Sequence, residues 1–145
     1  MIHKFAAAAA VAILLSAGAA AGAAQAETIH FAATLTGAGE NPANSSQGKG
    51  ELTAELETAE HVLTYRATYT GLSGPANMAH FHGPAEPGHN APPVVVVKDP
   101  SSPISGTAVL TPTQQSDLMA GKWYFNVHSQ ANPGGEIRGQ VERLN

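Results

Sequence analysis

The chain has 145 residues, with 7 Lys and Arg against 11 Asp and Glu, a formal net charge of −4, and no cysteine. An acidic balance without a basic stripe argues against a nucleic-acid partner and against binding to an anionic membrane surface. The missing thiols exclude disulfides, a Cys nucleophile, a zinc ribbon and a blue-copper centre, which leaves imidazole and carboxylate as the metal ligands to consider.

The first 26 residues have the features of a secretory signal peptide. A basic start at 1–4 precedes an apolar, Ala-rich run at 5–15, and Ala24-Gln25-Ala26 fits a small-residue cleavage site. The apolar run is too short to span a membrane, so we expect an exported protein, periplasmic or extracellular, without a membrane span. Removing 26 of the 145 residues leaves 119, with a net charge of −5, which suits a single domain over residues 27–145.

Alternating apolar and polar residues predict strands through the first half of this domain. Residues 28–36 alternate in this way, which is typical of a strand with one side buried. Residues 37–50 are rich in Gly, Asn and Ser and predict a loop. Residues 51–57 and 61–70 repeat the alternation on either side of a short turn, so we expect them to pair as a hairpin.

The stretch 77–93 is the most distinctive part of the chain, because it holds three of the seven histidines and four of the ten prolines. In a strand from Met78 to His82, the two-residue period places Met78, His80 and His82 on one face. Two imidazoles would then lie side by side. The Gly83-Pro84 pair ends the strand, because proline cannot donate to a ladder.

Composition predicts the next segments. Four consecutive valines, Val94–Val97, predict a short strand covered on both faces. Residues 105–110 alternate and predict a further strand. Thr111 suits a helix cap, Pro112 the first helical position and Gly121 the position just past the end, so we expect one two-turn helix over 113–120.

Two more predicted strands, 122–129 and 136–142, complete the pattern. The first of them places Tyr124, Asn126 and His128 on the face opposite its apolar residues. Seven or eight short strands separated by Gly and Pro, with one short helix, predict an all-β fold. We expect an antiparallel β-sandwich, immunoglobulin-like or barrel-like.

Four segments carry a resemblance to a known family: LTGAGENP from Leu35, YTGL ending at Leu72, AHFHGPAEPG around His80, and GKWYFNVHSQANPGGEIRGQV from Gly121 to Val141. Together they resemble the CHRD domain, a module named after the extracellular antagonist chordin and also found singly in secreted microbial proteins. The resemblance implies an immunoglobulin-type sandwich that acts as an exported binding or interaction module, with an unidentified extracytoplasmic protein or ligand as its partner. It implies no catalytic residues, because no reaction is established for the family as a class. The family's signature positions correspond here to His80, His82, Gly83, Pro84, Asn126, His128, Pro133, Gly135, Glu136 and Arg138.

His80, His82 and His128 are the candidate metal ligands. The H-x-H spacing leaves two imidazoles on the same side of one strand, and the third comes from another strand. Three imidazole nitrogens with an open fourth position suit zinc, and the same ligands suit copper(II). We expect Asn126 and Glu136 to orient the imidazoles from behind. On this hypothesis the protein binds copper or zinc, and in its strongest form the hypothesis adds redox activity.

A second hypothesis assigns the same residues to a structural polar network in a module without a metal. Arg138 would hold Glu136 or a backbone carbonyl, and His128 would donate to the turn at 132–135. A cupin-type site, suggested by Glu86 after the H-x-H pair, is set aside because no second cupin motif follows. The convergence of three imidazoles on one side of the sheet distinguishes the metal hypothesis from the structural one.

Overall fold

The computed structural model of the chain describes residues 25–145, so the predicted signal peptide lies almost entirely outside the described residues. Within the described part, strands and loops dominate, as the all-β prediction requires. The strands are β1 (Thr28–Thr36), β2 (Lys49–Glu57), β3 (Val62–Thr70), β4 (Ala76–His82), β5 (Pro93–Val96), β6 (Ile104–Val109), β7 (Tyr124–Ser129), β8 (Ile137–Gln140) and β9 (Glu142–Arg143). The helices are α1 (Pro112–Met119) and a 3-10 turn after β1, η1 (Gly37–Gly39).

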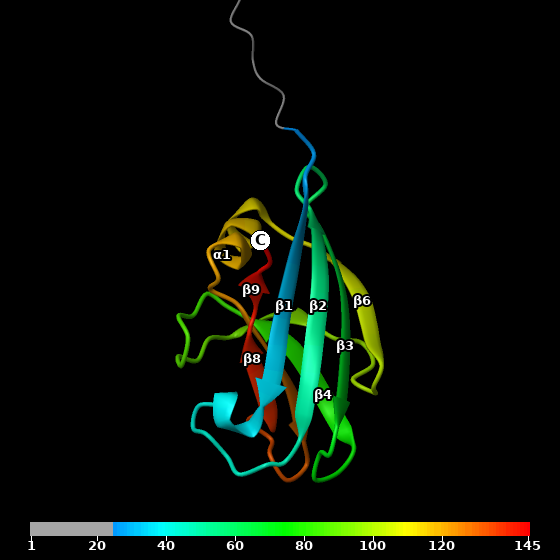
Figure 1. Cartoon of the computed structure of the whole chain (residues 1–145), viewed down its shortest axis with the longest axis vertical. Coiled ribbons are helices and arrows are strands. Elements are labelled where there is room, and N and C mark those ends of the chain that lie inside the picture. The colour runs from blue at the N-terminus through cyan, green and yellow to red at the C-terminus, as the bar shows by residue number, and fades with distance from the viewer. Residues whose placement is uncertain (1–24) are drawn as a thin grey trace, which may run out of the picture.

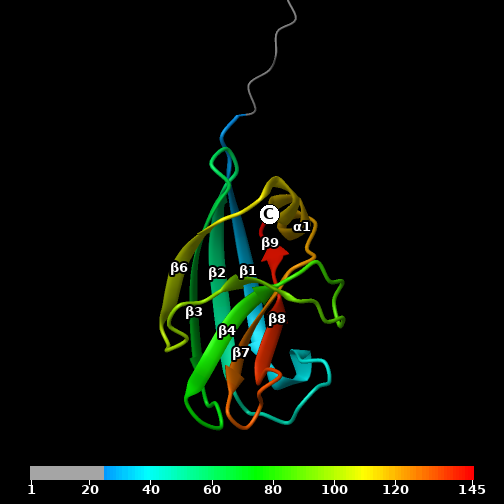
Figure 2. The ribbon, with the colours of Figure 1, turned by 180° about the vertical axis from the view of Figure 1, so that it is seen from behind.

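The strands belong to one antiparallel sheet that curls on itself. Its order is β5-β4-β7-β8-β1-β2-β3-β6, with β9 paired to β1. Figure 1 shows β1, β2, β3 and β6 as one wall. Figure 2, seen from the other side, shows β4, β7 and β8 as the opposite wall. The predicted all-β class with a short helix is confirmed. Of its two expected forms the fold takes the barrel-like one, because the strands share a single, nearly closed sheet.

The core lies between the two walls and is filled by the inward-facing residues of the alternating strands. Phe31, Leu52 and Leu63 come from one wall and Phe81 and Phe125 from the other, and each is at most 1% exposed. Because side chains alternate along a strand, the residues between them point outward. On β4 and β7, that outward face carries the histidines.

Helix α1 lies at the end of the sheet near the C-terminus (Figure 1). The Thr111 side chain accepts from the backbone N–H of Gln114 at 3.1 Å, and the Gln114 side chain accepts from the backbone N–H of Thr111 at 2.9 Å, which forms a capping box. Gly121 follows with φ of +72°, a left-handed conformation that favours glycine. Leu118 is fully buried, so packing holds this short helix in place.

The valine run does not have both faces covered, contrary to the expectation from its sequence. Strand β5 is an edge of the sheet, paired with β4 alone, and Val96 is 66% exposed. Val97, just past the strand, is buried at 6% exposure. A β-branched run predicts a strand, but the cover on each face comes from segments far away in the sequence.

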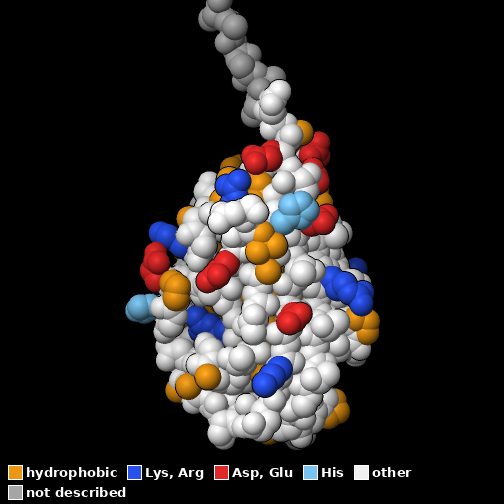
Figure 3. Space-filling model, in the orientation of Figure 1, with side chains coloured by type: hydrophobic (Ala, Val, Ile, Leu, Met, Phe, Trp, Pro, Cys, Tyr) orange, Lys and Arg blue, Asp and Glu red, His pale blue; other side chains and the backbone are white. Residues whose placement is uncertain are grey.

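The surface mixes charges of both signs. On the face that Figure 3 shows, acidic and basic side chains are interspersed, so this face presents no continuous field of one sign. No helix among residues 25–145 has the length and apolar character needed to span a membrane.

Candidate metal centre

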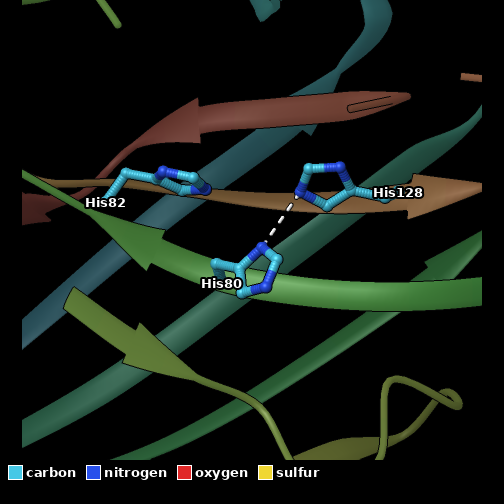
Figure 4. A group of neighbouring side chains, drawn as sticks. All are labelled: His80, His82 and His128. Carbon is cyan, nitrogen blue, oxygen red and sulfur yellow. Dashed lines mark hydrogen bonds between the residues drawn. The ribbon is translucent and has the colours of Figure 1, made fainter. Parts of the chain in front are cut away.

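Three histidines come together on the outward face of the β4 and β7 pair. His80 and His82 lie on β4 and His128 on β7, and the register sets His80 opposite Asn126 and His82 opposite Tyr124. The ligand nitrogens of the three rings all lie within 4.8 Å of one another, and Figure 4 shows the rings gathered around a common space. This is the one such group of His, Asp and Glu side chains in the described part of the chain.

Two backbone carbonyls determine which nitrogen of His82 and His128 carries the proton. Nδ1 of His82 lies 2.8 Å from the carbonyl oxygen of Ala91, and Nδ1 of His128 lies 2.9 Å from that of Pro133. A carbonyl oxygen can only accept, so Nδ1 is the donor in both rings. In the neutral imidazole, Nε2 then carries a free lone pair, and both Nε2 atoms face the same side chain, Asn126.

Asn126 lies between these rings and is 2% exposed. Its Oδ1 is 3.0 Å from Nε2 of His82 and 2.9 Å from Nε2 of His128. Nδ1 of His80 lies 3.1 Å from the same Nε2 of His128. Acceptor atoms this close repel one another unless a proton or a cation lies among them. The cluster therefore requires either a bound cation or a specific placement of protons.

A protonated Glu40 can provide the second of these arrangements, in which protons and not a cation separate the acceptor atoms. Its Oε1 is 3.5 Å from Nδ2 of Asn126. Burial raises the pKa of Glu40 to about 7, against the opposing effects of Arg138 and of the contact with Asn126. When the Asn126 amide is turned by 180°, a protonated Glu40 donates to its oxygen and the amide nitrogen donates to both Nε2 atoms. This arrangement satisfies the two rings without a metal.

The imidazoles of β4 are held in the neutral form. Burial, together with the neighbouring His128 and His82, lowers the pKa of His80 to about 4. Burial also lowers the pKa of His82, against the hydrogen bonds to Ala91 and Asn126. A metal binds the neutral imidazole, so both rings are in the ligating form at neutral pH.

The ring of His82 is held by a stack that includes Arg138. Tyr124 lies parallel to His82, with a centroid distance of 4.6 Å and an interplanar angle of 4°, and the Arg138 guanidinium lies 3.4 Å from the centroid of the Tyr124 ring. Arg138 also donates to Oδ1 of Asn90 and to the carbonyl oxygen of His89, both in the loop that anchors His82. It therefore fixes the stack and the loop together.

Glu136 lies outside the histidine cluster, so the expectation that it orients an imidazole is wrong. Of the two partners expected for Arg138, the structure shows a backbone carbonyl, that of His89, and not Glu136. Its Oε1 accepts from the Ser46 hydroxyl at 2.6 Å and from the Ser73 N–H at 2.7 Å. Its Oε2 accepts from the hydroxyls of Ser73, at 2.8 Å, and Ser129. Burial alone would raise the pKa of Glu136, but these hydrogen bonds outweigh burial and lower it to about 2. The carboxylate therefore joins the segments that carry Ser46 and Ser73 to the end of β7 at Ser129.

Other polar residues near the H-x-H pair also lie outside the cluster. Glu86, which completes the cupin-like spacing, lies in a loop and pairs with Lys122 at 3.6 Å. His89 is exposed and contributes its carbonyl oxygen to Arg138. The histidine cluster among the described residues thus contains no carboxylate ligand.

Glu40 and Tyr124 are not among the site residues predicted from the sequence. The alternation along β7 placed Tyr124 on the histidine face, but its stacking partner could be identified only in three dimensions. Nothing in the sequence connects Glu40 with Asn126. The pairing of β1 with β8 brings the loop after β1 to this site, where Thr36 lies opposite Arg138.

Fold and site together define an all-β, barrel-like domain with a histidine cluster on its outer face. A family model described as the CHRD domain matches residues 31–141, and the chain therefore belongs to the CHRD domain family. Neither a search of curated proteins nor a search of solved structures found a match. The resemblance noted in the sequence is confirmed, and membership supports a binding or interaction module at the level of the family.

Proposed function

We propose that this CHRD domain is an exported module that binds one copper or zinc ion through His80, His82 and His128. The observation that carries the proposal is the convergence of the three rings, whose ligand nitrogens lie within 4.8 Å of one another. Two of these rings are oriented by backbone carbonyls so that an unprotonated Nε2 faces the cluster. Fixing the tautomer by the second ring nitrogen is the usual device of metal-binding histidines.

The spacing of the atoms suits a small ion. Two ligand atoms bound to one tetrahedral ion at roughly 2.0–2.1 Å lie about 3.3 Å apart. The contact between His80 and His128 is 3.1 Å, close to that value. The third nitrogen lies within 4.8 Å of the other two. The Asn126 oxygen, 2.9 and 3.0 Å from the two Nε2 atoms, stabilises the positive charge from the inner side.

Export is part of the proposal and is based on residues 1–26. Cleavage after Ala26 leaves Glu27 as the first residue, directly before β1 at Thr28. The intact mass of the protein recovered outside the cytoplasm tests this point. A mass that corresponds to the uncleaved chain would contradict it.

Metal binding is tested by titrating the purified, metal-free protein with Cu(II) and Zn(II), and by measuring bound metal by mass spectrometry. We expect one equivalent in the parent protein. The double variant His80→Ala, His82→Ala should lose at least about tenfold in affinity, because metal affinity depends on each ligand. His30→Ala is the matched control, since His30 is an exposed residue of β1.

Circular dichroism of each variant separates loss of ligands from loss of fold. One-equivalent binding that survives in the folded double variant would overturn the proposal. A parent protein that takes up neither copper, in either oxidation state, nor zinc would also overturn it and would leave the proton arrangement through Glu40 as the explanation of the cluster.

A further inference from the structure

We infer that Met78 supplies a thioether ligand to the histidine centre, so that the centre prefers Cu(I) to Zn(II). This inference rests on the proposed function, because it concerns the same site. It assigns a fourth ligand and a metal selectivity that three imidazoles do not by themselves determine.

The register of the sheet places Met78 next to two of the three histidines. Met78 precedes His80 by two residues on β4, so both side chains share the outward face. In the pairing of β4 with β7, Met78 lies directly opposite His128. Residues opposite each other in an antiparallel pair have Cβ atoms about 4.5–5.5 Å apart. With its three rotatable bonds, a methionine side chain in this position can reach the space among the rings.

The inner side of the centre is closed by other groups. Asn126 lies against His82 and His128 on the side of Glu40, and Tyr124 stacks on His82. The less buried side is that of His80, the one histidine of the three that is not buried, which shares the outward face of β4 with Met78. Met78 itself is 42% exposed, so no core packing holds its side chain elsewhere.

The chemistry of the ligand determines which ion the centre binds more tightly. A thioether is a soft ligand, which favours Cu(I), whereas zinc takes nitrogen, thiolate and carboxylate ligands. The cluster among the described residues offers no carboxylate. Three imidazole nitrogens and one thioether sulfur therefore form a neutral ligand set that suits a monovalent copper ion.

The test is the variant Met78→Leu, which keeps an apolar side chain of similar size and removes the sulfur. Cu(I) affinity is measured anaerobically by competition with a chromophoric Cu(I) chelator, and Zn(II) affinity by competition with a zinc indicator. We expect about a tenfold or greater loss of Cu(I) affinity and less than about a twofold change for Zn(II). Met119→Leu is the matched control, because Met119 is 37% exposed but lies on α1.

X-ray absorption of the Cu(I)-loaded protein gives a second readout. We expect a sulfur scatterer in the parent and in Met119→Leu, and only nitrogen or oxygen in Met78→Leu. Equal Cu(I) affinities for the parent and Met78→Leu, or a parent spectrum without sulfur, would overturn the inference. In either case, binding that is lost in the His80→Ala, His82→Ala variant would leave the proposed function intact. A parent that binds no metal overturns both.

Discussion

Glu136 shows how neighbouring side chains set the pKa of a single buried residue in this domain. It is fully buried, and its two oxygens accept from Ser46, Ser73 and Ser129. Its pKa of about 2 lies below the ordinary 4.5, so the folded state binds the proton less tightly than the unfolded state. The stabilisation is therefore fully present above pH 4.5 and is lost as the pH falls from 4.5 to 2.

We predict that Glu136→Gln lowers the free energy of unfolding at pH 7 by about 2–3 kcal/mol. The amide nitrogen would replace one acceptor oxygen and face a donor that it cannot satisfy. Urea unfolding of the parent and the variant measures the difference. Glu51→Gln is the control, because Glu51 lies on the exposed face of β2, and its change should stay within about 0.5 kcal/mol. Equal effects of the two substitutions would contradict the prediction.

Glu40 has the opposite linkage to pH. Its pKa is raised to about 7, so the folded state holds the proton more tightly, and the associated stability is lost as the pH rises from 4.5 to 7. Glu40→Gln removes this titration. We predict that the stability of the variant relative to the parent rises by roughly 2–3 kcal/mol between pH 4.5 and 7. Chemical unfolding at several pH values measures it, and a difference that does not change with pH would refute it.

At the level of elements, the edge strand β5 shows that chemically identical valines in one run differ in burial. Adjacent residues have opposite environments, because Val96 is 66% exposed and Val97 is 6% exposed. The backbone N–H of Val97 also donates to the carbonyl oxygen of Ala79 on β4 at 3.0 Å, which holds its side chain against the core.

This difference predicts unequal costs for the same substitution. Val97→Ala should lower stability by about 2 kcal/mol, because it removes buried methyl groups and leaves a cavity. Val96→Ala should change stability by less than about 0.5 kcal/mol. Thermal melts of the two variants provide the comparison. A larger loss for Val96→Ala would show that this edge is covered in solution.

For the molecule as a whole, the contact of β8 with β1 joins the two walls of the sheet. Gly139 on β8 lies against the backbone of β1, where a Cβ would collide with the carbonyl oxygen of Thr34. Backbone cannot yield as a flexible side chain can, so a larger residue would separate the two strands. The same contact brings Glu40, which follows β1 and η1, to the histidine site.

We predict that Gly139→Ala destabilises the domain by about 2–3 kcal/mol, as overpacking does. It should also weaken metal binding, because β8 pairs with β7, which carries His128, and supplies Arg138 to the stack on His82. Gly134→Ala is the control, since a Cβ there meets nothing within 4 Å. Unfolding midpoints and the Cu(II) titration are the measurements. An unchanged midpoint for Gly139→Ala would mean that β8 and β1 are less tightly joined than the structure shows.

Much of the fold could be predicted from local patterns. The alternation along β1, β2, β3 and β7 appears in the chain itself, and the cap residue Thr111, Pro112 and the glycine after α1 determine the helix by short-range chemistry. The H-x-H spacing likewise places His80 and His82 on one face. These features depend on residues close in sequence, so they could be predicted from the sequence alone.

Long-range features depended on the tertiary structure. Only the curled sheet shows that β5 is an edge strand and that Glu136 accepts hydrogen bonds from Ser46, Ser73 and Ser129. The proximity of His128 to the β4 pair could be proposed from the sequence, but its geometry could not. The sequence by itself determined the strand periodicity and the ligand types, because both depend on local stereochemistry. Closure of the sheet decided which of these residues meet, because contacts between distant strands depend on register and packing across the whole barrel.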